Sequence, residues 1–190
     1  MIKKGDVINP YVIADNERII RDLSFIEDAR IHITWTNDSN YVDLLVITKD
    51  VWSIGVDGNI DNSNAGDLSI YEDNLLGLGY KLNNQIFIDT KNKSSLGYSG
   101  LFEAKNIKGS FVNAWLNYYN VFDNQAYTGS LYRNFISSKI KYGGGLTLSR
   151  IEGLDKIHSL DYDSNRVSLK YNYQDFWLGR AFTLNSKRFP

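Results

Sequence analysis

Oxygen-bearing side chains gather in residues 61–72, where their spacing resembles a calcium-binding loop. Donors occupy the first, third, seventh, ninth and twelfth loop positions: Asp61, Ser63, Asp67, Ser69 and Glu72. Gly66 stands at the sixth position, as in such loops, but Ala65 occupies the fifth, where a side-chain oxygen is needed. The flanking residues also have the pattern of strands, not helices. We therefore interpret the segment as an Asn- and Gly-rich hairpin loop and expect no metal there.

The two histidines, His32 and His158, are far apart in the sequence and give no ligand cluster. Ser159, Asp161 and Asp163 surround His158 in a polar segment, but no Gly-x-Ser-x-Gly elbow is present. The chain has no cysteine, which excludes thiol nucleophiles and zinc–thiolate sites. We expect no catalytic residue, no metal and no cofactor, and thus a protein that is not an enzyme.

The composition narrows the class of protein further. Hydrophobic residues make up 43 % of the chain, yet no apolar run approaches the ~18 residues that a membrane helix needs. The net charge is −1 and no basic stripe is present, so we expect no nucleic-acid partner. There are 13 Tyr and 4 Trp. These aromatic residues are typical of strands and of membrane-interface belts, although they could also line a carbohydrate groove.

The elements that would position any site begin with a small α/β unit in residues 1–50. Asn9 and Pro10 are a favourable N-cap and first helical residue, and the apolar spacing predicts a helix that ends near Ser24. An alternating strand through Trp35, a turn at residues 37–40 and a second strand at 41–48 follow.

From Val51 onwards the residue pattern of the sequence changes. Seven or eight segments alternate apolar and polar residues, each bounded by Gly, Asn, Asp or Ser. This pattern predicts an antiparallel meander over residues 51–190, which could form a soluble sandwich, a soluble barrel or a membrane barrel. The polar positions are rich in Asn, Gln, Gly and Tyr rather than Lys and Glu, and aromatic residues concentrate near segment ends. These two features favour the membrane barrel.

Several motifs resemble those of the BamA/TamA outer-membrane superfamily, surface antigen type, in its Bacteroidota-like form. Residues 5–31 resemble the second half of a POTRA domain, and residues 42–50 resemble the final POTRA strand that leads into the barrel. Residues 73–80, with the sequence DNLLGLGY, resemble a turn between early barrel strands. Residues 105–111 fall at a later turn of the family, and residues 143–146 resemble a later Gly-rich strand.

The resemblance implies a mainly β fold: a partial antiparallel transmembrane β-barrel of about eight strands preceded by a small α/β POTRA-like unit. It places the chain in the outer membrane of a Gram-negative bacterium, with residues 1–50 in the periplasm. Residues 57–66, 90–95, 122–126 and 151–165 would then be extracellular loops. Residues 75–79, 106–109 and 137–140 would be periplasmic turns.

The sequence also departs from the family in two respects. The family's barrels have more strands than the seven or eight segments found here, and the late Val-Arg-Gly-aromatic loop motif is absent. We therefore expect the chain to be a fragment of a longer protein.

Two strand edges are the candidate partner-binding sites. An extended client can add to the edge of strand 42–48 by main-chain hydrogen bonds. The resemblance implies that strand 51–60 forms one side of a seam where client strands pair. The candidate residues are Val42, Leu44, Val46, Trp52, Ile54 and Val56.

These edges suggest a protein that assists insertion or translocation of proteins or envelope components by strand-edge templating. Its partners would be outer-membrane lipid and client outer-membrane proteins or periplasmic factors. A passive outer-membrane pore or envelope anchor is the first alternative. A soluble glycan-binding β-protein is the second.

Overall fold

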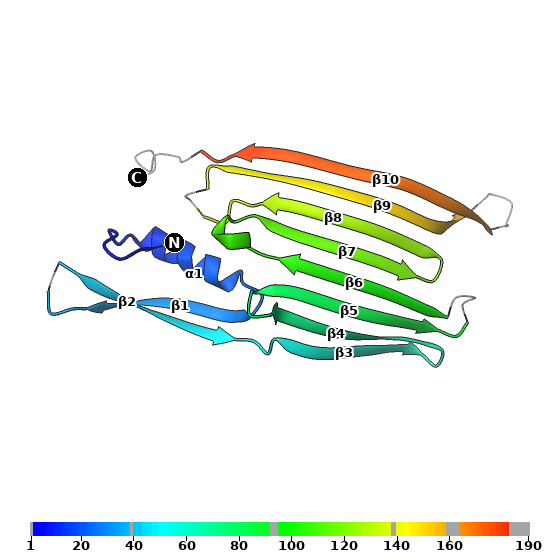
Figure 1. The fold of residues 1–190 in the computed structure, drawn as a ribbon, viewed down its shortest axis with the longest axis horizontal. Helices are drawn as coiled ribbons and strands as arrows, with labels where there is room; N and C mark the ends of the chain where they lie inside the picture. Colours follow the sequence, from blue (N-terminus) through cyan, green and yellow to red (C-terminus); the bar gives the residue numbers. More distant parts are fainter. Residues whose placement is uncertain (1, 39, 92–94, 138–139, 159–163, 183–190) are drawn as a thin grey trace.

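The computed structural model describes residues 2–38, 40–91, 95–137, 140–158 and 164–182. The described chain is mainly β, with one helix, a two-stranded sheet and an eight-stranded sheet, all antiparallel (Figure 1). The smaller sheet and the helix lie together beyond one end of the strands of the larger sheet. The mainly β, antiparallel fold predicted from the sequence is therefore confirmed, while the larger sheet is open rather than closed on itself.

Helix α1 (Pro10–Arg21) begins where the sequence predicts. The Asn9 side chain accepts a hydrogen bond from the backbone N–H of Tyr11 at 2.9 Å, and Pro10 occupies the first turn, where its missing N–H leaves no helical bond unmade. The helix ends earlier than the predicted Ser24, because Asp22 is its C-cap. Residues 22–25 instead form the connection that carries the chain to the larger sheet.

The two-stranded sheet pairs β1 (Ile26–Trp35) with β2 (Val42–Asp50), as the sequence predicts. Side chains of α1 bind the outer edge of β1: the Ile31 N–H donates to Glu17 at 2.7 Å, and Arg21 donates to the Ala29 carbonyl at 2.8 Å. Ala29 is fully buried. Because α1 already satisfies part of the β1 edge, the outer edge of β2 is the one left for a further strand.

The larger sheet is a meander in which consecutive strands pair, in the order β3 to β10. Its strands are β3 (Ile54–Asn62), β4 (Ala65–Leu75), β5 (Tyr80–Asp89), β6 (Leu96–Ala104), β7 (Asn113–Val121), β8 (Asn124–Arg133), β9 (Tyr142–His158) and β10 (Ser164–Arg180). The strands β3 to β8 have 9 to 11 residues each, whereas β9 and β10 have 17. The β9–β10 pair therefore extends past its neighbours at one end (Figure 1).

Three predicted loops prove to be mostly strand. The segment 57–66 belongs to β3 and β4 apart from the turn at Ser63 and Asn64, and 122–126 is a turn at Phe122 and Asp123. The segment 151–165 continues β9 and begins β10, so that only residues 159–163, which lie outside the described residues, separate the two strands. In each case pairing with the next strand outweighs the Gly, Asn and Asp content that favours a loop.

The register divides the sheet into two faces. We call one the apolar face: it carries the even-numbered residues of β3–β7, the odd-numbered residues of β8 and the even-numbered residues of β9 and β10. The other face, which we call the polar face, carries the remaining residues; on β10 these include the exposed Val167, Leu169, Tyr171 and Tyr173. Its side chains bond to one another across strands, as in the pairs Thr128–Ser149 at 2.7 Å and Ser130–Thr147 at 2.8 Å.

The helix and the connection after it dock on the turns at one end of the sheet. The Ser24 hydroxyl lies 2.6 Å from the Asp73 carbonyl oxygen and 3.0 Å from that of Gly79. Gly79 has φ +70° and lies under the Phe25 ring, where a Cβ would collide with the ring. Lys105 donates to the Asp22 carbonyl at 3.1 Å. The turns after β4 and β6, which the sequence analysis grouped together, therefore lie at the end that α1 contacts; we call it the turn end, and the opposite one the loop end.

Candidate functional site

The apolar face is exposed over its whole width. Large hydrophobic side chains with 39 % to 86 % exposure are found there on every strand of the sheet. They are Ile54, Val56, Ile60, Leu68, Ile70, Ile86, Ile88, Leu96, Tyr98, Leu116, Tyr127, Leu131, Leu146, Leu148, Leu154, Phe176 and Leu178. A water-soluble sheet covers its apolar face with a second layer of structure. In the described residues α1 lies at the turn end, and no such layer covers this face.

Apart from Leu154 of β9, which is exposed six residues beyond Leu148 towards the loop end, these side chains form a band. The border of this band on the loop-end side crosses the strands diagonally. Along each strand towards the loop end, we take the last apolar residue on this face; on β3 it is Ile60. The residues paired with it across successive strands, its register row, are Gly66, Ile88 and Leu96 of β6. On β10 the last is Phe176, whose row runs through Leu146, Leu131 and Ala114 to Ala104 of β6. The two rows meet β6 at positions 96 and 104, so the border falls by eight residues between the first strand and the last.

This fall gives the inclination of the band relative to the strands. Eight residues span about 27 Å along a strand, and the seven strand-to-strand steps from β3 to β10 span about 34 Å. The border is therefore inclined by about 40° to the perpendicular of the strands. Strands of transmembrane barrels are tilted by about 35–45° from the membrane normal, which inclines a planar lipid boundary by the same angle to the register rows.

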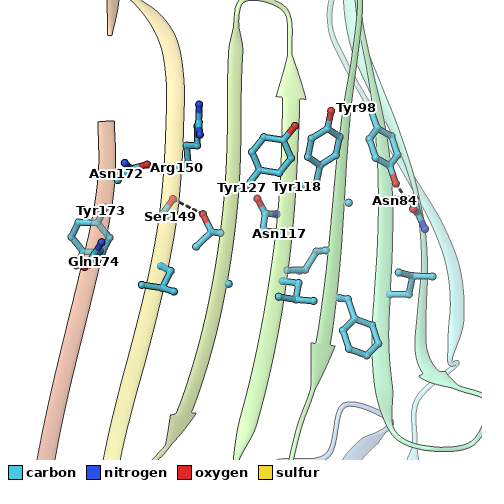
Figure 2. A pocket seen from close by; sticks show the side chains of 18 residues that line it. Asn84, Tyr98, Asn117, Tyr118, Tyr127, Ser149, Arg150, Asn172, Tyr173 and Gln174 are labelled. Atoms are coloured by element: carbon cyan, nitrogen blue, oxygen red, sulfur yellow. Dashed lines mark hydrogen bonds between the residues drawn. The ribbon is translucent and has the colours of Figure 1, made fainter. Parts of the chain in front are cut away.

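A shallow groove of about 640 Å³ lies on the apolar face near this border (Figure 2). Tyr98, Tyr118 and Tyr127 stand in a row along it, with ring centroids 6.0 Å and 5.0 Å apart. Gly100 and Gly129 lie in its floor, with Phe102, Leu116 and Leu148 among the apolar lining. The Tyr98 hydroxyl donates to the Asn84 side-chain oxygen at 2.7 Å, which pairs the one polar side chain that β5 places in the middle of the band.

A charged cluster stands on the apolar face at the loop-end side of the groove, which its member Arg150 lines. Glu152 binds Arg150 at 2.9 Å and Lys170 at 2.7 Å. The cluster carries a net charge of +1, from two cations and one carboxylate. Sequence reasoning missed both the tyrosine row and this cluster, because their members come from different strands and meet only through the register.

The predicted partner-binding residues divide between the edges of two separate sheets. Ile54 and Val56 lie on β3, each 65 % exposed, while Trp52 stands in the connection just before the strand and is 90 % exposed. β3 and β10 are the two edge strands of the larger sheet.

One hydrogen bond shows to which side the backbone N–H and C=O groups of each β3 residue point. The Ser53 carbonyl accepts from the Asp73 N–H, so Ser53 points towards β4. Because backbone groups alternate along an antiparallel pair, the N–H and C=O groups of Ile54, Val56 and Gly58 point to the unpaired side. The β3 edge therefore presents a row of free backbone groups next to exposed apolar side chains.

Val42, Leu44 and Val46 lie on β2, whose outer edge is unpaired in the described sheets. Val42 and Leu44 line a hollow of about 740 Å³ between the start of β2 and residues 2–8. Val46 is 49 % exposed. The structure thus brings the three β2 residues to one exposed strand, as the sequence predicts, but does not bring them together with the β3 residues.

The calcium-loop pattern does not form a cluster. Asp61 lies at the loop end of the β3–β4 hairpin, Asp67 accepts a hydrogen bond from Gln85 at 2.7 Å, and Glu72 bonds to the Asn74 N–H at the turn end. No group of three or more His, Asp or Glu side chains that could hold a metal occurs among the described residues. His32 is exposed on β1, and the His158 side chain lies outside the described residues, as do Ser159, Asp161 and Asp163.

No family model matches the chain, and no curated protein matches it. In the part of the chain that the structure describes, no helix is long and apolar enough to cross a membrane.

Proposed function

We propose that the chain is part of an outer-membrane β-barrel of the BamA/TamA type, which assists insertion or translocation of proteins or envelope components by strand-edge templating. The apolar face would contact lipid, and the polar face would line the lumen. The α/β unit of residues 1–50 would be a POTRA-like unit in the periplasm. In this proposal further strands pair with the edges of β3 and β10 and complete the barrel.

The observation that carries the proposal is the inclined apolar band. From β3 to β10 the last apolar residue on this face shifts by eight register positions towards the turn end, a shift that a water-soluble sheet does not require. A planar membrane crossing tilted strands imposes such a boundary, at the inclination found here. Strand length supports the same interpretation, since β3 to β8 have the 9 to 11 residues that suit a tilted transmembrane strand.

The position of the α/β unit supports the proposed orientation. The connection after α1 docks on the turn after β4 through Ser24, and Lys105 of the turn after β6 binds Asp22 at the end of the helix. In the proposed barrel the unit would therefore lie at the mouth of the lumen, on the side of the short turns. Short turns are typical of the periplasmic end of outer-membrane barrels.

The templating function depends on the β3 edge. The free N–H and C=O groups of Ile54, Val56 and Gly58 can pair with any extended segment, since main-chain bonds do not depend on sequence. A passive pore or anchor would have the same lipid-facing band but would not use this edge. The edge therefore separates the proposed function from its first alternative.

A proline substitution tests the edge without disturbing the sheet. Val56→Pro removes an N–H that points away from β4, whereas Asp57→Pro removes one that points towards it. We expect V56P to insert into vesicles like the unaltered chain but to lose its acceleration of the folding of a nascent outer-membrane protein. D57P should impair insertion itself, because it breaks the β3–β4 ladder.

The outcomes of these experiments distinguish the three candidate functions. Unchanged client folding with V56P, or no acceleration by the unaltered chain, would contradict templating and favour a passive pore or anchor. Recovery of the unaltered chain in the aqueous fraction without detergent would contradict the membrane barrel and favour the glycan-binding alternative.

A further inference from the structure

We propose that the groove on the apolar face binds a phosphate-bearing lipid of the outer leaflet, with its acyl chain over Gly129 and its phosphate on Arg150 and Lys170. This inference rests on the proposed membrane location of the apolar face. It adds a lipid-binding site that the templating function does not require.

The shape of the groove supports an acyl chain as the occupant. Gly129 leaves the floor without a side chain at its position, whereas the Tyr98 side chain lies over Gly100. Phe102, Leu116 and Leu148 also line the groove. Gly129 lies two residues from Tyr127 towards the turn end, within the apolar band, whereas Gly100 shares the register row of Tyr118 and Tyr127. A hydrocarbon chain lying in the groove would contact protein both beneath it and along its sides. It would therefore gain van der Waals contacts that a chain on a flat surface lacks.

Position relative to the border supports a lipid rather than a free anion. Tyr118, Tyr127, Arg150 and Asn172 share one register row, which the band border crosses between Tyr127 and Arg150. Tyrosine is favoured at the membrane–water interface, where its hydroxyl can reach water. The cations of the cluster therefore stand at headgroup level beside the apolar groove.

Charge supports a phosphate-bearing headgroup. The Arg150 and Lys170 side chains are 54 % and 59 % exposed although both bind Glu152, whose side chain is 37 % exposed. The guanidinium group has five N–H donors. The Arg150 Nε–H donates to the Glu152 carboxylate at 2.9 Å, and Nη2 lies 2.9 Å from the same oxygen, which leaves at least three N–H groups. Arg150 can thus keep Glu152 while donating from its remaining N–H groups to a phosphate oxygen.

The test measures lipid retention by the inserted chain. The full chain is inserted into phosphatidylcholine vesicles that contain a minor fraction of lipid A, which carries phosphate groups, or of its dephosphorylated form. After extraction in mild detergent, native mass spectrometry measures the bound lipid. We expect the phosphorylated form to be retained and the dephosphorylated form to be lost.

Charge variants define the headgroup contacts. R150Q and K170Q should each reduce retention about fivefold, the factor that corresponds to ~1 kcal/mol for one basic residue near an anionic surface. E152Q should increase it, because it raises the net charge of the cluster. K49Q is the matched control: Lys49 is also an exposed lysine paired with a glutamate, Glu27, but it lies on β2.

A second pair of variants tests the groove itself. Gly129→Val fills the floor, where a Cβ would stand 3.2 Å from a Leu116 methyl group, and should abolish retention. Gly58→Val adds the same bulk to the same face on β3, with a similar 3.3 Å approach to the Asp67 carbonyl, and should leave retention unchanged.

The possible failures can be told apart. If the unaltered chain does not insert, the proposed membrane location fails, and the lipid site with it. If the chain inserts but R150Q, K170Q and G129V retain as much lipid A as K49Q and G58V, the lipid site is wrong and the barrel stands. Equal retention of the dephosphorylated lipid would also overturn the site.

Discussion

Leu131→Arg provides the sharpest single test of the lipid-facing band. Leu131 lies on the apolar face of β8 and is 54 % exposed, so an arginine there would meet no steric obstacle. In a water-soluble sheet such an exposed substitution changes the free energy of unfolding by no more than about 0.5 kcal/mol. In a membrane the same arginine would have to enter the hydrocarbon.

The position of Leu131 on β8 gives its depth in the proposed membrane, and this depth determines the free-energy cost of an arginine there. Tyr127 is the last apolar residue of β8 on this face, and Leu131 is four residues further towards the turn end. Four residues span about 14 Å along the strand, which a tilt of about 40° reduces to about 10 Å of depth. The apolar band of an outer-membrane barrel is about 25 Å tall, so Leu131 lies near its middle, where an arginine costs about 2–4 kcal/mol.

Gln125→Arg is the matched control. Gln125 is on the same strand and the same face as Leu131, but on the loop-end side of Tyr127 and thus outside the band. An arginine near the interface costs about 0–1 kcal/mol. We expect equilibrium unfolding in urea from phosphatidylcholine vesicles, followed by tryptophan fluorescence, to show a loss for L131R that exceeds the loss for Q125R by about 2–3 kcal/mol. Equal effects of the two substitutions would refute the assignment of the band to lipid.

Two further predictions concern packing on the polar face and docking of the α/β unit. Gly145→Val should destabilise the fold by about 1–3 kcal/mol in the same urea titration, because its Cβ would overlap the Trp177 indole, and W177A in the same chain should reduce the penalty. A penalty that W177A leaves unchanged would contradict this contact. Ser24→Ala should cost about 1 kcal/mol and speed amide exchange in residues 75–79, because two carbonyls lose their donor. Exchange there no faster than in the control S63A, at the opposite end of the sheet, would refute the docking.

The sequence predicts most of the fold because alternation is a local signal. The helix start at Asn9 and Pro10 and the apolar positions of β3 to β8 follow from spacing and capping alone. The positions at which strands end depend less on the local sequence. Residues 57–62 have the composition of a loop, yet Gly58 pairs with Leu68 and Asn59 with Asp67, so the second strand of the hairpin keeps them extended.

The candidate sites likewise divide into those that could be proposed from the sequence and those that depend on the pairing of distant strands. Val42 could be proposed from the sequence because strand 42–48 is the last strand of the predicted α/β unit. Ile54 and Val56 could be proposed because the resemblance implies a client-pairing seam at strand 51–60. The tyrosine row, the Arg150–Glu152–Lys170 cluster and the inclination of the apolar band could not be. Each depends on which residues of different strands share a register row, and a shift of the register by one residue would move every side chain to the other face.

Lipid accessibility along the sheet tests the central claim most directly. The chain has no cysteine, so single cysteines can be introduced and spin-labelled one at a time. In vesicles, oxygen collision rates should be high at positions 114, 116 and 118 of β7 and low at positions 113, 115 and 117. The last lipid-exposed position should move from 60 on β3 to 176 on β10, following the inclined border. Equal access of a water-soluble relaxation agent to the even positions of β7, or a border that stays on one register row, would contradict the account.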